Sequence, residues 1–278
     1  MARRRLSFAW LKPPKVPADG IMTLGEHLRE LRYRFIFSAV AIVLVATLCG
    51  LFYDPMYQLL LYPWSLAIAD LKQSNPGIDT SVVNIGVTAP FMLAMKICGF
   101  GGLILSSPVW LYQAWAFIVP ALLAKEKKLA LGFIAAAVPL FIAGVFVGWW
   151  ILPKGIEVML SFTPSSVPVT NMLDINNFLD MLLQLMLVSG LAFLLPVFLV
   201  GLNLVGVVTA KGLAKARTYA IFGCFVFGAA ATPSTDPFSM LALAVPMGLL
   251  YVAAEVICRV NDRRRARRGL EAGLDVAL

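Results

Sequence analysis

Long apolar runs alternate with short polar connections along most of the chain. Six runs approach the roughly 20 apolar residues that a membrane-spanning helix needs. They cover residues 35–53, 89–111, 129–152, 181–205, 219–231 and 238–257. Between them stand segments such as "KQSNPGID" and "TPSSVPVTN", whose Pro, Gly, Asn and Asp residues are typical of loops. The pattern therefore predicts an all-α polytopic membrane protein with six transmembrane helices.

The last two predicted spans are short. The run at 219–231, "YAIFGCFVFGAAA", has 13 residues. At 1.5 Å per residue it reaches about 20 Å, against a hydrocarbon core of about 30 Å. Two explanations stay open: the bilayer thins locally, or Thr218 and Thr232 extend the helix by a turn.

Composition supports the membrane class and excludes several others. The 278 residues are 60% hydrophobic and 14% charged, whereas soluble domains have about 45–50% apolar and about 25% charged residues. No nucleic-acid-binding module is visible, although the net charge is +8. The four cysteines and the single His27 have no metal-binding or redox spacing. We therefore expect neither a metal nor another cofactor.

The basic residues predict the orientation of the spans. Of the 23 Lys and Arg residues, all but Lys72, Lys96 and Lys154 lie before the first run, after the second, after the fourth or after the last. By the positive-inside rule, both termini are then cytoplasmic. The predicted organisation is a basic cytoplasmic tail at 1–22, a six-helix membrane domain at 23–257 and a second basic cytoplasmic tail at 258–278.

Two acidic residues stand among the basic residues of this predicted inner face. Glu30 lies in "TLGEHLRELRYR", just before the first run, and Glu126 lies in "AKEKK" after the second. Both have an ordinary structural interpretation. Glu30 can pair with Arg34 one helical turn away, and Glu126 can pair with its neighbouring lysines.

Lys96 is the remaining charged residue inside a predicted span. An ionisable residue at membrane depth is a functional candidate by default. Lys96 can lie in a polar interior of the bundle, or its amine can reach the interface along its own long side chain.

Four segments carry a resemblance to a known family. They are "HLRELRYR" before the first run, "APFMLAMK" at 89–96, "SSPVWLYQAWAFIVPALLAKEKK" at 106–128 and "ATPSTDPFSMLALAVPM" at 231–247. Over about residues 23–257 the chain resembles the TatC family, the polytopic subunit of the twin-arginine protein translocase.

The resemblance implies a function without covalent chemistry. It implies a core receptor subunit in the bacterial cytoplasmic membrane that binds the twin-arginine signal peptides of folded precursor proteins. Glu30 and Glu126 match the carboxylates that read the paired arginines, and Phe117 matches an aromatic position beside them. Carboxylates accept the planar guanidinium fork through two hydrogen bonds, which agrees with this role.

The resemblance also implies partners. TatA- or TatB-like single-span subunits assemble with the family in a multi-copy complex that the proton-motive force drives. We expect them near the connection between the last two spans, where Thr232 and Met240 lie. The lipid bilayer is the other expected partner.

The chain departs from the family at two positions. Leu194 stands in the fourth span where many members have a glutamate, and Val252 stands at an expected acidic position of the sixth, with Glu255 displaced toward the cytoplasmic end. An ion-coupled carrier of small solutes is the alternative function. Such carriers usually need titratable carboxylates near the membrane midplane, and these spans have almost none. No nucleophile–base or metal motif predicts an enzyme.

The predicted topology can be tested by cysteine accessibility in a variant without the native cysteines. A cysteine at position 76 should react with an impermeant reagent from outside the cell. A cysteine at position 126 should react only from inside, because the positive-inside rule puts that loop in the cytoplasm. Labelling of position 126 from outside would overturn the orientation.

Overall fold

The computed structural model describes residues 24–74, 79–118, 127–163, 170–231 and 237–275. The chain forms two compact units. The first unit combines residues up to 53 with residues 94–138, and the second combines residues 54–93 with residues from 139 onward. Helices α3 (Ala89–Leu105) and α6 (Lys127–Ser161) each contribute residues to both units.

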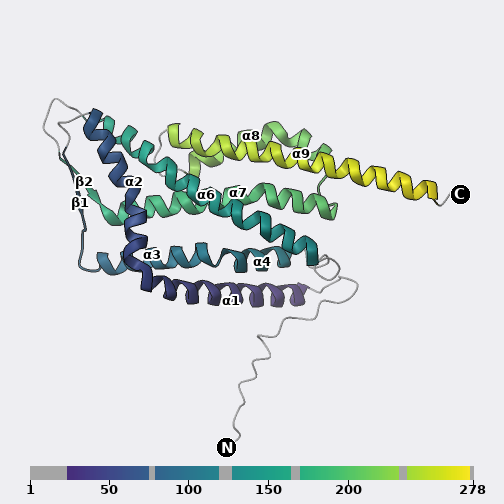
Figure 1. Ribbon diagram of the computed structural model, residues 1–278, viewed down its shortest axis with the longest axis horizontal. Helices are drawn as coiled ribbons and strands as arrows, with labels where there is room; N and C mark the ends of the chain where they lie inside the picture. Colours follow the sequence, from purple (N-terminus) through teal and green to yellow (C-terminus); the bar gives the residue numbers. More distant parts are fainter. Residues whose placement is uncertain (1–23, 75–78, 119–126, 164–169, 232–236, 276–278) are drawn as a thin grey trace, which may run out of the picture. The chain divides into compact units, whose positions relative to one another are not determined.

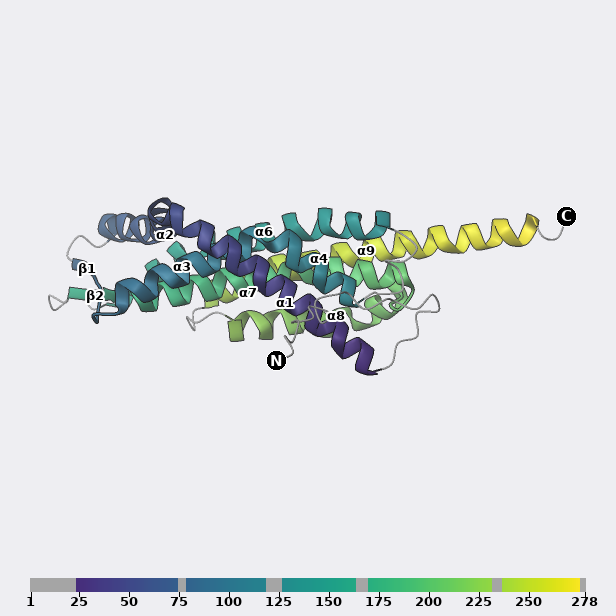
Figure 2. The same ribbon diagram turned by 90° about the horizontal axis from the view of Figure 1, so that it is seen from below.

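The first unit is built on helix α1 (Leu24–Cys49), which ends in the short 3₁₀ helix η2 (Gly50–Phe52). Helix α4 (Ser107–Ile118) lies beside α1 and runs in the opposite direction (Figures 1 and 2). Gly102 of α3 permits close contact with α1, because a Cβ atom at this position would lie 2.6 Å from the Cβ of Ala46. This packing brings the start of α1 next to the end of α4.

The second predicted span is bent rather than straight. Helices α3 and α4 meet at an angle of 59°. Pro108, in the first turn of α4, has no N–H group and cannot continue the α3 hydrogen-bond ladder. The Trp110 indole Nε1 donates to the Leu103 carbonyl across the bend at 2.9 Å and braces it.

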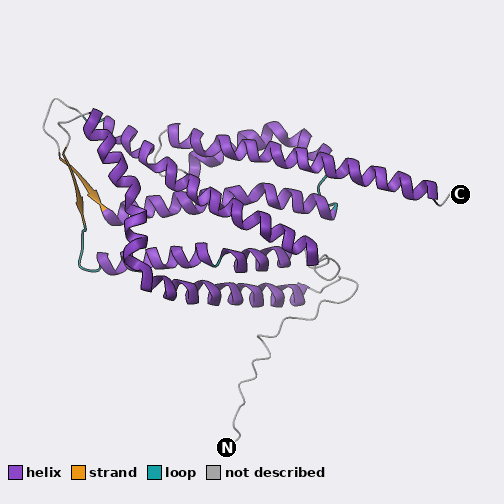
Figure 3. Cartoon of the chain, viewed as in Figure 1, coloured by secondary structure: helices purple, strands orange, loops and turns teal. Residues whose placement is uncertain are grey.

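The second unit contains most of the remaining helices. Helix α2 (Tyr53–Ser74) is followed by strand β1 (Asp79–Val83), and strand β2 (Thr170–Asp174) precedes helix α7 (Ile175–Val205). The strands pair in parallel, with Asp79 opposite Thr170 and Val83 opposite Asp174 (Figure 3). Helices α8 (Ala210–Ala231) and α9 (Pro237–Asp275) then pack side by side (Figure 1).

Helices α6 and α7 pack tightly through small residues. A Cβ atom at Gly144 of α6 would lie 2.5 Å from the Ser189 carbonyl oxygen and 2.8 Å from the Gly190 Cα. The fully buried Ser189 hydroxyl donates within its own helix, to the Leu185 carbonyl at 2.6 Å. Small residues at such contacts let two membrane helices approach closely. The core of this unit therefore depends on the absence of side-chain bulk at Gly144.

The prediction of an all-α polytopic membrane protein is confirmed. Within the described residues, four helical stretches are long and apolar enough to cross a membrane, and the bent α3–α4 pair is a further candidate. The four stretches are Leu24–Ala69, Leu131–Ser161, Ile175–Val205 and Met240–Arg267. Helix α8, which contains the short run at 219–231, is not among these candidates.

Two details were not predicted from the sequence. The connection after the first span, expected to be a loop, contains the 22-residue helix α2 with Pro63 inside it, and then β1. Helix α9 extends to Asp275, well past residue 257, so the described part of the expected C-terminal tail is helical. The sequence after residue 257 is rich in arginine, which has a high helix propensity.

A substitution at Gly144 tests the close packing. Gly144→Ala puts a methyl group against the Ser189 carbonyl, so the helices must separate, and we expect a loss of about 1–3 kcal/mol of stability. Gly248→Ala in α9 is the matched control, because nothing lies within 4 Å of its added Cβ. Thermal unfolding in detergent should show a lower midpoint for Gly144→Ala only. Equal midpoints for the two variants would contradict the packing.

Candidate functional site

Glu30 is a buried carboxylate near the start of α1, with only 1% of its surface exposed. Its Oε1 accepts two hydrogen bonds from Arg34 one turn later, from Nε at 2.9 Å and from Nη2 at 2.5 Å. Its Oε2 is also buried and has no hydrogen-bond partner among the described residues. The i,i+4 pairing expected from the sequence is therefore present, but it uses only one carboxylate oxygen.

Gln113 of α4 completes this cluster. The Arg34 Nη1 donates to the Gln113 Oε1 at 3.0 Å, so the guanidinium bridges α1 and α4. Gln113 is buried, and the Arg34 side chain is 16% exposed. Gln113 was not predicted from the sequence, although a polar residue in the apolar run "VWLYQAWAF" was a usable signal.

Phe117 lies beside the cluster. Its ring stacks on the His27 ring with centroids 4.4 Å apart and planes 17° apart, and this contact joins the two helices. Phe117, Arg34 and Gln113 also line a groove of about 310 Å³, together with Leu31, Phe35, Ser38, Trp110 and Ala114. The groove is largely apolar, with one cation and one amide in its wall.

The other predicted site residues fall in several places. Glu126 and Thr232 lie outside the described residues. Met240 is half-buried on α9, and its carbonyl oxygen would lie 3.0 Å from a Cβ atom at Gly228, so α8 and α9 approach closely there. Lys96 is half-buried on α3 and has interaction partners.

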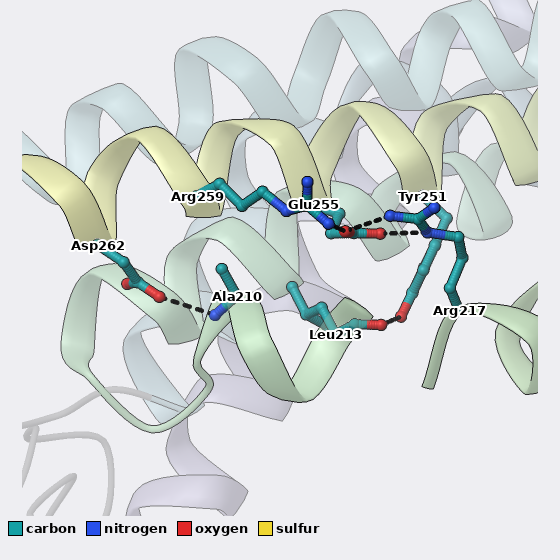
Figure 4. A network of polar contacts seen from close by, with 7 residues as sticks. All are labelled: Ala210, Leu213, Arg217, Tyr251, Glu255, Arg259 and Asp262. Atoms are coloured by element: carbon teal, nitrogen blue, oxygen red, sulfur yellow. Dashed lines mark hydrogen bonds and ion pairs between the residues drawn. The ribbon is translucent and has the colours of Figure 1, made fainter. Parts of the chain in front are cut away.

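A second buried carboxylate lies on α9. Glu255 is 1% exposed and accepts hydrogen bonds at both of its oxygens (Figure 4). Arg217 of α8 donates from Nε to Oε2 at 2.8 Å and from Nη2 to Oε1 at 2.7 Å. Arg259 donates from Nη2 to Oε1 at 2.6 Å. From the sequence, Glu255 was expected only to be displaced toward the cytoplasmic end, and its link between α8 and α9 was not predicted.

Electrostatics and neighbouring hydrogen bonds strengthen this junction. Hydrogen bonding to the Glu255 carboxylate raises the pKa of the Arg217 guanidinium above its ordinary value. Tyr251 donates its hydroxyl to the Leu213 carbonyl at 2.9 Å (Figure 4). The N–H of Ala210, the first residue of α8, donates to the Asp262 Oδ2 at 2.8 Å. A carboxylate at a helix N-terminus also interacts favourably with the helix dipole.

An apolar groove of about 900 Å³ lies between α7, α8 and α9 of the second unit. Ala192, Phe227 and Met247 are among the residues that line it, and Gln184 and Tyr251 are polar residues of its wall. Leu194 is buried in α7, where its 3% exposure leaves it in the apolar interior. A carboxylate at that position would need a partner in the same interior.

These helices and buried polar clusters define a polytopic membrane protein. Comparison with known proteins then gives its family. The profile of the family "Sec-independent protein translocase protein (TatC)" matches residues 26–246. The chain belongs to the TatC family and is therefore a component of a protein-transport system, which favours the translocase over the small-solute carrier.

Relatives and solved structures agree with this assignment. The TatC protein of Xylanimonas cellulosilytica is 37% identical over 247 residues, which cover 89% of this chain and 87% of the relative. The TatC protein of Frankia casuarinae is 36% identical, with 96% and 74% covered. A crystal structure of the twin-arginine translocase receptor TatC in the detergent DDM superposes with a TM-score of 0.69 at 31% identity, covering 84% of this chain and 99% of that one.

The Glu255 junction can be tested by removing either side of it. Arg217→Ala combined with Arg259→Ala leaves a buried carboxylate without a cation, whereas Glu255→Ala leaves two arginines, 43% and 46% exposed, that can return to water. Thermal unfolding in detergent should therefore show a larger loss for the double arginine variant. Arg217→Ala alone should lose less, because Arg259 remains. A larger loss for Glu255→Ala would refute this reasoning.

Proposed function

We propose that this chain is the core receptor subunit of a twin-arginine protein translocase. In this role it binds the twin-arginine signal peptides of folded precursor proteins and assembles with other Tat subunits in the bacterial cytoplasmic membrane. The proton-motive force drives the export, and the receptor itself contributes binding and assembly rather than covalent chemistry. Family membership supports the translocase role, and the chemistry around Glu30 supports the receptor role.

The buried carboxylate of Glu30 is the observation that carries the receptor proposal. A buried charge is retained only where it is paired, and it strongly favours a cation that can supply several hydrogen bonds. The guanidinium of arginine offers a planar fork of N–H donors, whereas the ammonium of lysine does not. Arg34 already shows that a guanidinium fits between α1 and α4. A signal-peptide arginine is the matching ligand, and Phe117 and the apolar groove offer contact to the rest of the peptide.

The orientation of the protein supports a common binding face. By the positive-inside rule, the loop that contains Glu126 and the segment before the first span are both cytoplasmic. Glu30 and Glu126 would then each accept one of the paired arginines. Both termini are cytoplasmic in this arrangement.

Partner subunits have a separate proposed surface. We assign TatA- or TatB-like single-span helices to the region of Thr232 and Met240, at the connection of α8 and α9. The neighbouring apolar groove is about 900 Å³ in volume and is suited to apolar side chains of a membrane helix. Helix association in a membrane depends on such packing rather than on the hydrophobic effect.

The receptor proposal predicts how the two carboxylates contribute to peptide binding. Hydrogen bonds to charged groups contribute roughly 1.5–3 kcal/mol. Glu30→Ala or Glu126→Ala should therefore weaken the binding of a twin-arginine signal peptide by about ten- to a hundredfold. Glu126→Lys should weaken binding further because it adds repulsion. Peptide titration against the detergent-solubilised protein measures these affinities.

The controls separate recognition from folding. A twin-lysine peptide should bind the unmodified chain less well, since lysine does not reproduce the guanidinium fork. Each variant must be inserted in the membrane and must unfold at a temperature close to that of the unmodified chain. Affinities within twofold of the unmodified chain for both alanine variants would remove the basis of the proposal.

A further inference from the structure

Arg34 separates the Glu30 carboxylate from the groove. Arg34 lines the groove wall, whereas Glu30, to which Arg34 is hydrogen-bonded, is 1% exposed and is not among the lining residues. A ligand that enters the groove therefore meets the guanidinium of Arg34 before it meets the carboxylate. A cationic ligand in the groove can therefore bind the Oε1 of Glu30 only after Arg34 releases it.

The bond between Arg34 and Glu30 is incomplete when compared with the other buried carboxylate of the chain. Arg217 binds Glu255 fork to fork, with one donor on each oxygen. Arg34 instead directs Nε and Nη2 to the same oxygen of Glu30 and leaves Oε2 buried without a partner among the described residues. A carboxylate with an unsatisfied buried oxygen gains when a guanidinium reaches both oxygens.

The position of Arg34 in the sequence explains this difference. Arg34 and Glu30 are one turn apart on the same helix, so the helix fixes the direction from which the guanidinium approaches. Arg217 and Glu255 lie on different helices and approach each other freely enough to form the fork. A ligand arginine has the same freedom because it is not attached to α1.

We infer that Arg34 occupies, in the unliganded chain, the place that a signal-peptide guanidinium takes when it binds Glu30. The inference rests on the function proposed above and extends it to two further residues. Gln113 is an additional acceptor for the incoming guanidinium, because its Oε1 already accepts from Arg34. Arg34 is the internal competitor that lowers the affinity of the site for a cationic ligand.

The internal competitor has a clear consequence for selectivity. A ligand must replace three hydrogen bonds, two at Glu30 and one at Gln113. A guanidinium can replace all three from one planar group, whereas an ammonium cannot present the same fork. Arg34 lowers the affinity for both cations by the same factor, so at a low peptide concentration only the guanidinium, the intrinsically stronger ligand, still binds.

Replacement of Arg34 tests the inference. If Arg34 holds the carboxylate about nine-tenths of the time, its removal should increase the affinity for a twin-arginine peptide by about tenfold. Arg34→Gln is the main variant, and Arg32→Gln is its matched control, because Arg32 is an exposed arginine on the same helix. The control removes the same charge and should change the affinity by no more than about twofold, since solvent and salt screen exposed charges.

Two further variants complete the experiment. Arg34→Lys keeps the charge but not the fork, so its affinity for the twin-arginine peptide should lie between those of the unmodified chain and Arg34→Gln. If Arg34→Gln does not fold, Arg34→Lys replaces it in the test. The double variant Glu30→Ala/Arg34→Gln should not show the increase in peptide affinity, because that increase depends on the carboxylate that Arg34 vacates. The twin-lysine and twin-arginine peptides should gain by a similar factor from Arg34→Gln, because both must displace the same Arg34 contacts.

The outcomes distinguish this inference from the function on which it rests. Tighter binding by Arg34→Gln or Arg34→Lys, but not by Arg32→Gln, supports the internal competitor. If Glu30→Ala weakens binding while both Arg34 variants bind no better than Arg32→Gln, the inference is wrong and the receptor function stands. If Glu30→Ala leaves binding unchanged, the receptor function itself fails and the inference fails with it.

Discussion

The pairing of a buried carboxylate with an arginine of the same chain occurs in both units of this protein. Glu30 joins α1 to α4 through Arg34 and Gln113, and Glu255 joins α9 to α8 through Arg217. A carboxylate buried among apolar helices is stable only when a cation and hydrogen bonds compensate for the lost water. In both pairs the carboxylate is buried, while the arginines stay partly exposed and stabilise it from the protein surface.

The two pairs are chemically similar and differ in completeness. Glu255 is satisfied at both oxygens by two arginines, which suits a permanent link between helices. Within the described part of the chain, Glu30 is satisfied at one oxygen and borders a groove through Arg34. The same interaction can therefore serve structure at one end of the chain and, as we propose, recognition at the other. The difference in hydrogen bonding follows from helix geometry. Arg34 lies one turn from Glu30 on the same helix, so the helix backbone restricts the direction from which its guanidinium approaches the carboxylate.

The apolar runs were sufficient to predict the membrane class, and the motifs were sufficient to predict the family. They did not predict α2, because its prolines and polar residues are also typical of loops. They did not predict the bend at Pro108 either, because the apolar residues of a run do not show whether the helix is straight or bent. The Arg34–Glu30 pair followed from local spacing. Gln113 and the Glu255–Arg217 link did not, because their partners are 79 and 38 residues away and depend on how the helices pack. Glu126 and Thr232 lie outside the described residues, so their predicted roles stay predictions.

The proposed binding mode can be tested with a high-resolution structure of the chain in complex with a twin-arginine signal peptide. We predict that a peptide guanidinium lies within about 3 Å of both Glu30 carboxylate oxygens or of Glu30 and Gln113, and that the Arg34 side chain has left Glu30. A complex in which Arg34 still holds Glu30 while both peptide arginines bind elsewhere would contradict it.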